Sequence, residues 1–202
     1  TAALITNMDS PLGSAVGNSL EGIESVEILK GKTSGDLWTV CRELSCRMLM
    51  LAGIGDKDEC GRLVDEAVES GEALKRFEMM VKLQGGDVSY IEDTSKFRKA
   101  SFSREVYAPA DGYITHMDSE KIGLTAVLLG AGREKKDDDI NHAAGIIIAA
   151  KMGDFVKRGE LLATLFADDE SRLDGAESRY LFAVSIGNKK PAEQPMILDY
   201  ID

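Results

Sequence analysis

The amino-acid sequence predicts an α/β (α+β) protein of two domains. Apolar residues recur at helical spacing over residues 19–83, whereas residues 99–202 carry short apolar runs separated by turn residues. The character of the sequence changes near residue 98. An apolar content of 44% and a charged content of 29% are ordinary for a globular chain. We therefore expect a mostly helical domain over residues 1–98 and an α/β domain over residues 99–202.

The first expected domain starts with a strand and continues as helices. Residues 1–6 are apolar without alternation, which is typical of a parallel-type buried strand. Residues 7–18 contain Gly13 and Gly17 and predict a loop. Cap residues and glycines then mark four helices: from Ser19 to Lys30, from a cap at Asp36 to Gly53, from Asp56 to near Gly71, and from Ala73 to Gly85.

The second expected domain mixes strands and helices. Gly153 and Gly159 mark two turns that need positive φ angles, and Val156 is expected to pack between them. The predicted elements are strands over 102–107 and 113–117, a helix capped by Ser119, a polar loop over 130–144, strands over 146–150 and 161–166, a helix over 170–178, and strands over 179–186 and 196–201.

Composition excludes several classes of protein. A net charge of −11 repels nucleic acid and anionic membranes, and no apolar run approaches the roughly 20 residues of a membrane span. Three cysteines are an odd number and fit a reducing, cytoplasmic setting, and two histidines supply no zinc constellation. We expect a cytoplasmic protein without nucleic-acid or membrane partners. Because the chain starts inside a strand and lacks an initiator Met, we expect a piece of a longer protein.

The loop after the predicted helix at 119–129 is one candidate for chemistry. Gly130, Gly132 and Arg133 resemble half of a phosphate-binding loop. Such loops bind anions at the N-terminus of a helix, however, and this one follows a helix C-terminus, where the dipole disfavours anions. We interpret it as a mobile or docking loop, with anion binding as the alternative. Lys135 and Lys136, followed by three aspartates, are interpreted as a solvated tip.

A second candidate is Lys151. The pattern Gly-Asp-x-Val-x-x-Gly-x-x-Leu, which begins at Gly153, also occurs in biotinyl and lipoyl carrier domains. Their modified lysine sits in its own hairpin well before the Gly-Asp turn, whereas Lys151 is almost adjacent to it. The pattern therefore predicts a shared barrel-sandwich or hammerhead-like scaffold without predicting a carrier function.

A third candidate is an oxygen-only cation site. Loop 11–18 can turn backbone carbonyls inward, and Glu21 or Glu24 on the following helix can add a carboxylate. In a continuous helix Leu12 and Glu24 would lie about 18 Å apart, so a shared ion requires the loop to fold back. A surface carboxylate is the alternative interpretation.

Several stretches taken together resemble the pyrimidine nucleoside phosphorylase and thymidine phosphorylase family. Their order and spacing carry the resemblance, which extends over essentially the whole chain. The stretches are residues 4–21, Phe77 with 84–86, 108–112, 129–136 and 145–154. The resemblance is to the C-terminal half of that family.

The resemblance implies a homodimeric enzyme that cleaves pyrimidine nucleosides with inorganic phosphate to free base and (deoxy)ribose 1-phosphate. It also implies a potassium ion bound by the carbonyls of Leu12 and Ala15 and by the carboxylate of Glu24. The family's phosphate- and base-binding residues lie in the N-terminal half, so no catalytic residue is carried over and the chain alone is expected to be inactive. The alternatives are a stand-alone binding or assembly domain and a biotin or lipoate carrier.

Overall fold

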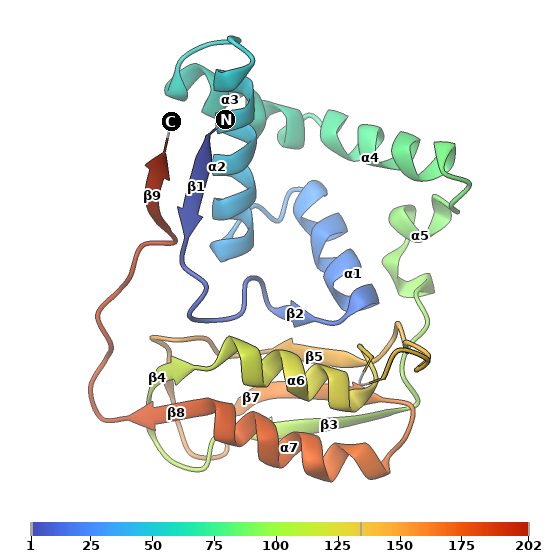
Figure 1. Cartoon of the computed structure of the whole chain (residues 1–202), viewed down its shortest axis with the longest axis vertical. Helices are drawn as coiled ribbons and strands as arrows, with labels where there is room; N and C mark the ends of the chain where they lie inside the picture. Colours follow the sequence, from blue (N-terminus) through green and yellow to red (C-terminus); the bar gives the residue numbers. More distant parts are fainter. Residues whose placement is uncertain (1, 134, 202) are drawn as a thin grey trace. The chain divides into compact units, whose positions relative to one another are not determined.

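The computed structural model describes residues 2–133 and 135–201 and divides into two compact units (Figure 1). The first unit contains the chain up to Asn7, Ile23–Lys96 and the segment from Pro195. The second unit contains Met8–Gly22 and Phe97–Gln194. The division after residue 96 lies close to the boundary expected at 98. The units differ from the expected ranges in that residues 8–22 fall in the second unit and the C-terminal strand in the first.

The first unit holds the two ends of the described chain in one small sheet. Strand β1 (Ala3–Thr6) pairs antiparallel with β9 (Ile197–Ile201), with Leu4 opposite Tyr200. The Asn7 amide extends this pairing by donating to the Met196 carbonyl at 2.8 Å. The prediction of a parallel-type strand is therefore wrong for this pairing. The apolar run at residues 1–6 does not indicate that this strand pairs with the C-terminal end of the chain.

Helices form the rest of the first unit. The Asp56 side chain accepts a hydrogen bond from the Glu59 amide at 2.9 Å and caps the third helix, as predicted. The second helix starts earlier than predicted, at Gly35, with Ser34 at the N-cap position and Asp36 inside the first turn. The helices are α1 (Asn18–Leu29), whose first turns belong to the second unit, α2 (Gly35–Leu51), α3 (Lys57–Glu69), α4 (Glu72–Leu83), α5 (Ser89–Glu92) and a 3₁₀ turn (Thr94–Lys96).

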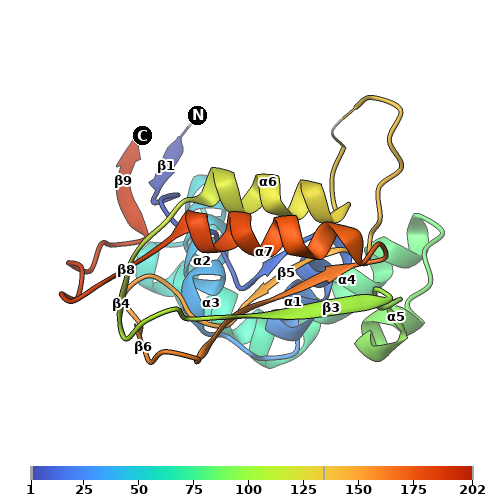
Figure 2. The same cartoon turned by 90° about the horizontal axis from the view of Figure 1, so that it is seen from below.

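The second unit consists of two sheets and two helices. A four-stranded sheet has the order β2 (Ala15–Val16), β5 (Gly145–Ile148), β7 (Leu161–Ala167), β3 (Phe102–Tyr107), and a three-stranded sheet has the order β6 (Phe155–Val156), β4 (Gly112–Met117), β8 (Val184–Gly187). Every pairing in these sheets is antiparallel. Helices α6 (Ser119–Leu129) and α7 (Ser171–Ala183) lie side by side over the four-stranded sheet (Figure 2).

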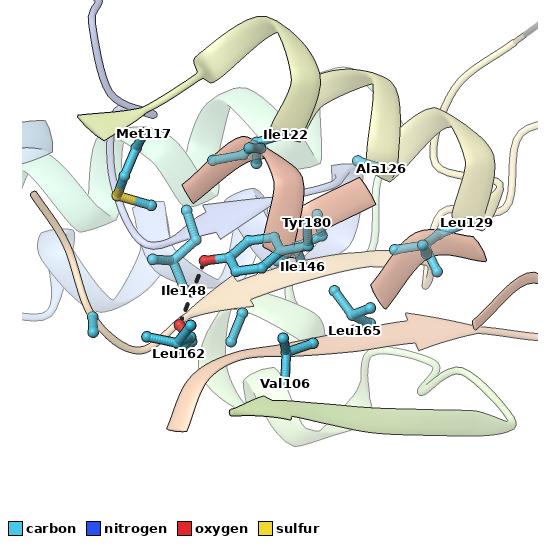
Figure 3. Packing of buried hydrophobic residues seen from close by; sticks show 14 of the residues in the cluster. Val106, Met117, Ile122, Ala126, Leu129, Ile146, Ile148, Leu162, Leu165 and Tyr180 are labelled. Carbon is cyan, nitrogen blue, oxygen red and sulfur yellow. Dashed lines mark hydrogen bonds between the residues drawn. The ribbon is translucent and has the colours of Figure 1, made fainter. Parts of the chain in front are cut away.

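The core of the second unit lies between these helices and the sheet. Ile122 and Leu129 from α6, Ile146 from β5 and Leu165 from β7 are all buried (Figure 3). Tyr180 of α7 is fully buried among them, and its hydroxyl donates to the Leu162 carbonyl at 3.5 Å. Burial raises the pKa of Tyr180 above its usual range, so the phenol stays protonated.

One predicted strand is partly a helix. The sequence predicts a helix over 170–178 and a strand over 179–186, but α7 continues to Ala183 and the strand begins at Val184. Leu173, Ala176, Tyr180 and Ala183 are all buried and follow helical spacing. Packing of this stripe against the sheet outweighs the β-propensity of the aromatic residues near its end.

Candidate functional site

Two glycines bring the N-terminal loop against the loop that follows α6. A Cβ on Gly17, where φ is +144°, would lie 2.5 Å from the Ala144 carbonyl oxygen. A Cβ on Gly145, where φ is +150°, would lie 2.3 Å from the Val16 carbonyl oxygen. Any other residue would clash with backbone at either position, so glycine permits the contact between β2 and β5 at this point.

The first turn of α1 holds the loop over residues 130–144. The Asn18 side-chain amide donates to the Ala131 carbonyl and the Ser19 backbone amide to the His142 carbonyl, both at 3.0 Å. The Glu21 carboxylate accepts from the Gly17 amide at 2.9 Å. Glu21 thus caps the start of α1 through the amide of Gly17, whereas the side chain of Asn18, the first residue of the helix, donates to the loop. These bonds attach both ends of the loop to one helix end.

A charged network anchors the base of the same loop. The Arg98 guanidinium lies 2.7 Å from an Asp168 carboxylate oxygen, which also accepts from the Asn141 side-chain amide at 2.9 Å. The other oxygen of Asp168 accepts from the Ser101 amide at 2.8 Å and from its hydroxyl at 3.0 Å. Hydrogen bonds from Arg98 and Ser101 lower the pKa of Asp168 to about 2, so it is ionised at neutral pH.

The network borders a cavity of about 340 Å³ in the second unit. The charges around it are neutralised locally. Arg172, for example, donates to the Leu128 carbonyl at 3.2 Å and lies 3.6 Å from Asp169. The arrangement therefore acts as an anchor for the loop and offers no strong excess charge to a ligand. The lining residues are Arg98, Leu129, Gly130, Asp139, Ile140, Asn141, Asp168, Asp169 and Arg172.

The far part of the loop carries basic side chains. Arg133, Lys135 and Lys136 are exposed. The Lys135 amide donates to the Asp138 carboxylate at 2.8 Å, and the Asp138 amide donates back to the Lys135 carbonyl at 3.1 Å, which forms a tight turn. The loop leaves the C-terminus of α6 through Gly130, where φ is +106°. Anion binding by the loop stays a prediction.

The predicted cation ligands fall in different units. Leu12 and Ala15 belong to the second unit, whereas Glu24 belongs to the first. Among residues 2–133 and 135–201, no group of three or more His, Cys, Asp or Glu side chains is placed to hold a metal ion. That search does not address a site built largely from backbone carbonyls. The potassium site at Leu12, Ala15 and Glu24 therefore stays a prediction.

Lys151 lies inside the Gly-Asp turn itself. Its backbone amide donates to the Asp154 carboxylate at 2.8 Å, and the Asp154 amide donates to the Lys151 carbonyl at 3.0 Å. The lysine therefore shares one turn with Asp154 and does not occupy a hairpin of its own. This geometry supports the interpretation of the pattern as scaffold. In the described part of the chain, no helix has the length and apolarity needed to cross a membrane.

The family model and the similar proteins all indicate the same family. Residues 113–187 match the family model described as pyrimidine nucleoside phosphorylase C-terminal domain. The chain is 40% identical over 172 residues to a pyrimidine-nucleoside phosphorylase of Bacillus subtilis, a match that covers 85% of this chain and 40% of the relative. It is 36% identical over 181 residues to the pyrimidine-nucleoside phosphorylase of Geobacillus stearothermophilus, covering 89% of this chain and 42% of the relative.

A pyrimidine-nucleoside phosphorylase of Staphylococcus aureus (strain NCTC 8325) is 39% identical over 169 residues, covering 83% of this chain and 39% of the relative. The chain thus spans about two fifths of the length of the curated relatives it matches. The matched lengths exceed the second unit, so the similarity extends into the helical first unit as well. The chain therefore belongs to the pyrimidine nucleoside phosphorylase family and contains its C-terminal domain.

Proposed function

We propose that this chain supplies the C-terminal part of a pyrimidine nucleoside phosphorylase, which converts a thymidine- or uridine-type nucleoside and inorganic phosphate into free base and (deoxy)ribose 1-phosphate. The observation that carries the proposal is the extent of the similarity. The matched segments, which are 36–40% identical overall, are 172 and 181 residues long and so extend beyond the C-terminal domain matched over residues 113–187. A scaffold borrowed for another purpose would be expected to resemble the family over that domain alone.

The proposed reaction breaks the bond between the anomeric carbon and the base nitrogen while a phosphate oxygen forms a new bond to that carbon. The electron pair of the broken bond leaves with the base, which must be stabilised as it departs. Catalysis of this kind relies on positioning the phosphate and on donors aimed at the developing charges. In the described residues we find no cluster that combines these groups. We therefore propose that this chain alone is inactive and that the complementary part of the enzyme supplies them.

Within this proposal the loop over residues 130–141 helps to close the site. It holds three basic side chains, Arg133, Lys135 and Lys136, and four acidic ones, so the loop as a whole carries no excess of positive charge. Arg133 precedes the acidic residues and is the group proposed to contact phosphate. Asn18 and Asp168 hold the loop at its base and so limit where Arg133 can lie.

The potassium ion and the homodimer are part of the same proposal. The carbonyls of Leu12 and Ala15 and the carboxylate of Glu24 are oxygen donors, the type that hard cations prefer. When bound, such an ion would restrain both the loop that carries Leu12 and Ala15 and the part of α1 that carries Glu24. A potassium-dependent rise in the melting temperature of the complete enzyme, absent in a Glu24→Gln variant, is the expected result. A rise of equal size in that variant would remove Glu24 from the site.

A chimaera tests the proposed function. The 202-residue chain replaces the matched segment of the Bacillus subtilis phosphorylase, and release of base from thymidine and from uridine is followed by absorbance. We expect release that depends on inorganic phosphate. A folded chimaera that releases no base from either nucleoside would contradict the proposal.

A further inference from the structure

Helices α6 and α7, which lie side by side in Figure 2, border a small cleft in the second unit. The cleft has a volume of about 320 Å³ and is lined by Lys121, Leu124, Ser178, Arg179 and Phe182, which we call the α6–α7 cleft. All five residues are exposed, in contrast to the residues of the same helices that pack on the sheet. The cleft is therefore separate from the core and open to solvent.

The α6–α7 cleft combines apolar surface with positive charge. Leu124 and Phe182 are 52% and 77% exposed, and among the described residues none that lines the cleft is acidic, although the chain has a net charge of −11. The Lys121 ammonium lies 5.1 Å from the centre of the Phe182 ring and 2.5 Å from an Asp118 carboxylate oxygen, which offsets part of its charge. Arg179 makes no ion pair within residues 2–133 and 135–201. The cleft thus offers one uncompensated guanidinium beside two apolar side chains.

The size of the α6–α7 cleft indicates a small ligand. Its volume lies at the lower end of the range of about 300–1,000 Å³ that is typical of small-molecule sites. Leu124 and Phe182 are the two large apolar side chains of α6 and α7 that are exposed. A stable protein interface buries about 800 Å² on each partner, far more than two side chains provide. The cleft is therefore better matched to one small molecule than to a protein surface.

The charge of the α6–α7 cleft selects among small ligands. One unpaired guanidinium balances one negative charge, and its planar pair of donors matches the two oxygens of a carboxylate. A polyanion would gain little more from this single group, and the net charge of −11 would repel it more strongly than a monoanion. The two apolar side chains add a preference for a ligand with an apolar body.

We infer that the α6–α7 cleft binds a small apolar carboxylate, of which a medium-chain fatty acid is the simplest example. The carboxylate pairs with Arg179, and the apolar part lies against Leu124 and Phe182. Lys121 adds a weaker attraction, because Asp118 shares its charge. The inference concerns the second unit alone and does not depend on the proposed function.

NMR titration tests the inference. The ¹⁵N-labelled 202-residue chain is titrated with sodium octanoate, and the amide signals are followed. We expect saturable shifts that are largest at residues 121–124 and 178–182. Acetate carries the charge without the apolar chain and is expected to leave these signals unchanged. 1-Octanol carries the chain without the charge and is expected to bind there about threefold more weakly or less tightly still, the effect of losing an exposed ion pair.

A larger apolar cavity in the first unit serves as an internal control. It has a volume of about 630 Å³ and lies between α1, α2 and α3, and its described lining residues, which include Trp38 and Leu49, carry no charge. Octanoate and 1-octanol are therefore expected to shift its signals alike. Octanoate shifts confined to this cavity, with none at residues 121–124 and 178–182, would overturn the inference.

Two arginine variants separate the local charge from the overall charge. Arg179→Glu places a carboxylate against the ligand carboxylate and is expected to weaken octanoate binding at the cleft at least about tenfold, while 1-octanol binding stays unchanged. Arg158→Glu makes the same change of charge at an exposed arginine elsewhere in the second unit and is expected to leave octanoate binding unchanged. Equal binding by Arg179→Glu and wild type, or equal weakening by both variants, would overturn the inference.

Phe182→Ala tests the apolar part of the cleft. Removal of the ring is expected to weaken octanoate and 1-octanol alike, by at least about threefold, because both lose the same contact. Circular dichroism checks that each variant is folded, as expected for substitutions at exposed positions. If Phe182→Ala bound both ligands as tightly as wild type, the apolar part of the ligand would not lie in this cleft.

Discussion

Gly17 and Gly145 meet backbone against backbone where α1 follows β2 and where β5 begins. A Cβ on Gly17 would lie 3.0 Å from the Cα of Gly145, and a Cβ on Gly145 would lie 3.1 Å from the Cα of Gly17. Both residues have positive φ angles. This contact joins the N-terminal loop to the end of the loop over residues 130–144, and it depends on the absence of a side chain at both positions.

Gly145→Ala is expected to destabilise the chain more than Gly153→Ala. Both glycines have positive φ angles, so each substitution carries a backbone cost of about 1–3 kcal/mol. Only at Gly145 would the new methyl group also clash with backbone, whereas nothing lies within 4 Å of a Cβ on Gly153. Urea unfolding of the two variants measures the difference. Equal loss of stability would show that the close contact is not rigid.

Asp168→Asn is expected to lower the melting temperature at neutral pH and to have no effect near pH 2. The folded-state pKa of Asp168 is lowered to about 2, below its unfolded value of about 3.9. Its contribution is therefore fully present above about pH 4 and is lost as the pH falls towards 2. Melting of wild type and variant across this range tests the sign. Asp137→Asn, at an exposed position in the same loop, is the control and should show no such pattern.

Tyr180 separates the roles of packing and hydrogen bonding in the second unit. Tyr180→Phe removes only the hydroxyl that reaches the Leu162 carbonyl and is expected to cost about 1 kcal/mol. Tyr180→Ala opens a cavity in the core and is expected to cost about 3–5 kcal/mol. Chemical denaturation gives both values. Similar losses for the two variants would mean that the hydroxyl, and not the ring, dominates.

Arg133→Ala in the chimaera is expected to raise the KM for phosphate or to lower turnover. The expectation follows from the exposed positive charge on a loop that Asn18 and Asp168 hold at its base. Arg158→Ala removes an equal charge from an exposed turn elsewhere in the second unit and serves as control. If Arg133→Ala changed neither constant, the loop would have no part in handling phosphate.

Local signals in the sequence predict most of the fold. Gly130 and the cap at Asp56 mark helix ends through interactions within a few residues, and strand 102–107 is predicted to the residue. Errors arise where a distant partner decides the outcome. Tyr180 continues a helix because the sheet covers its face, and β1 pairs with the far end of the chain. Neither effect can be predicted from a short stretch of the sequence.

The anchors of the loop could not be predicted for the same reason. Arg98 and Asp168 lie far apart in the sequence, and neither belongs to a recognisable motif. The glycine pattern predicts the loop itself but not that Asn141 would join these two residues. The family resemblance, in contrast, depends on the order of several stretches, and the comparisons confirm it without requiring any contact.

The most direct test of the account is phosphorolysis by the 202-residue chain alone, measured beside the chimaera. Thymidine and uridine are incubated separately with inorganic phosphate, and release of base is followed by absorbance. We expect no release by the folded chain and phosphate-dependent release by the chimaera. Phosphate-dependent release by the chain alone would contradict it, because a complete site would then lie within these residues, and Arg133, Lys135 and Lys136 would be the first to test.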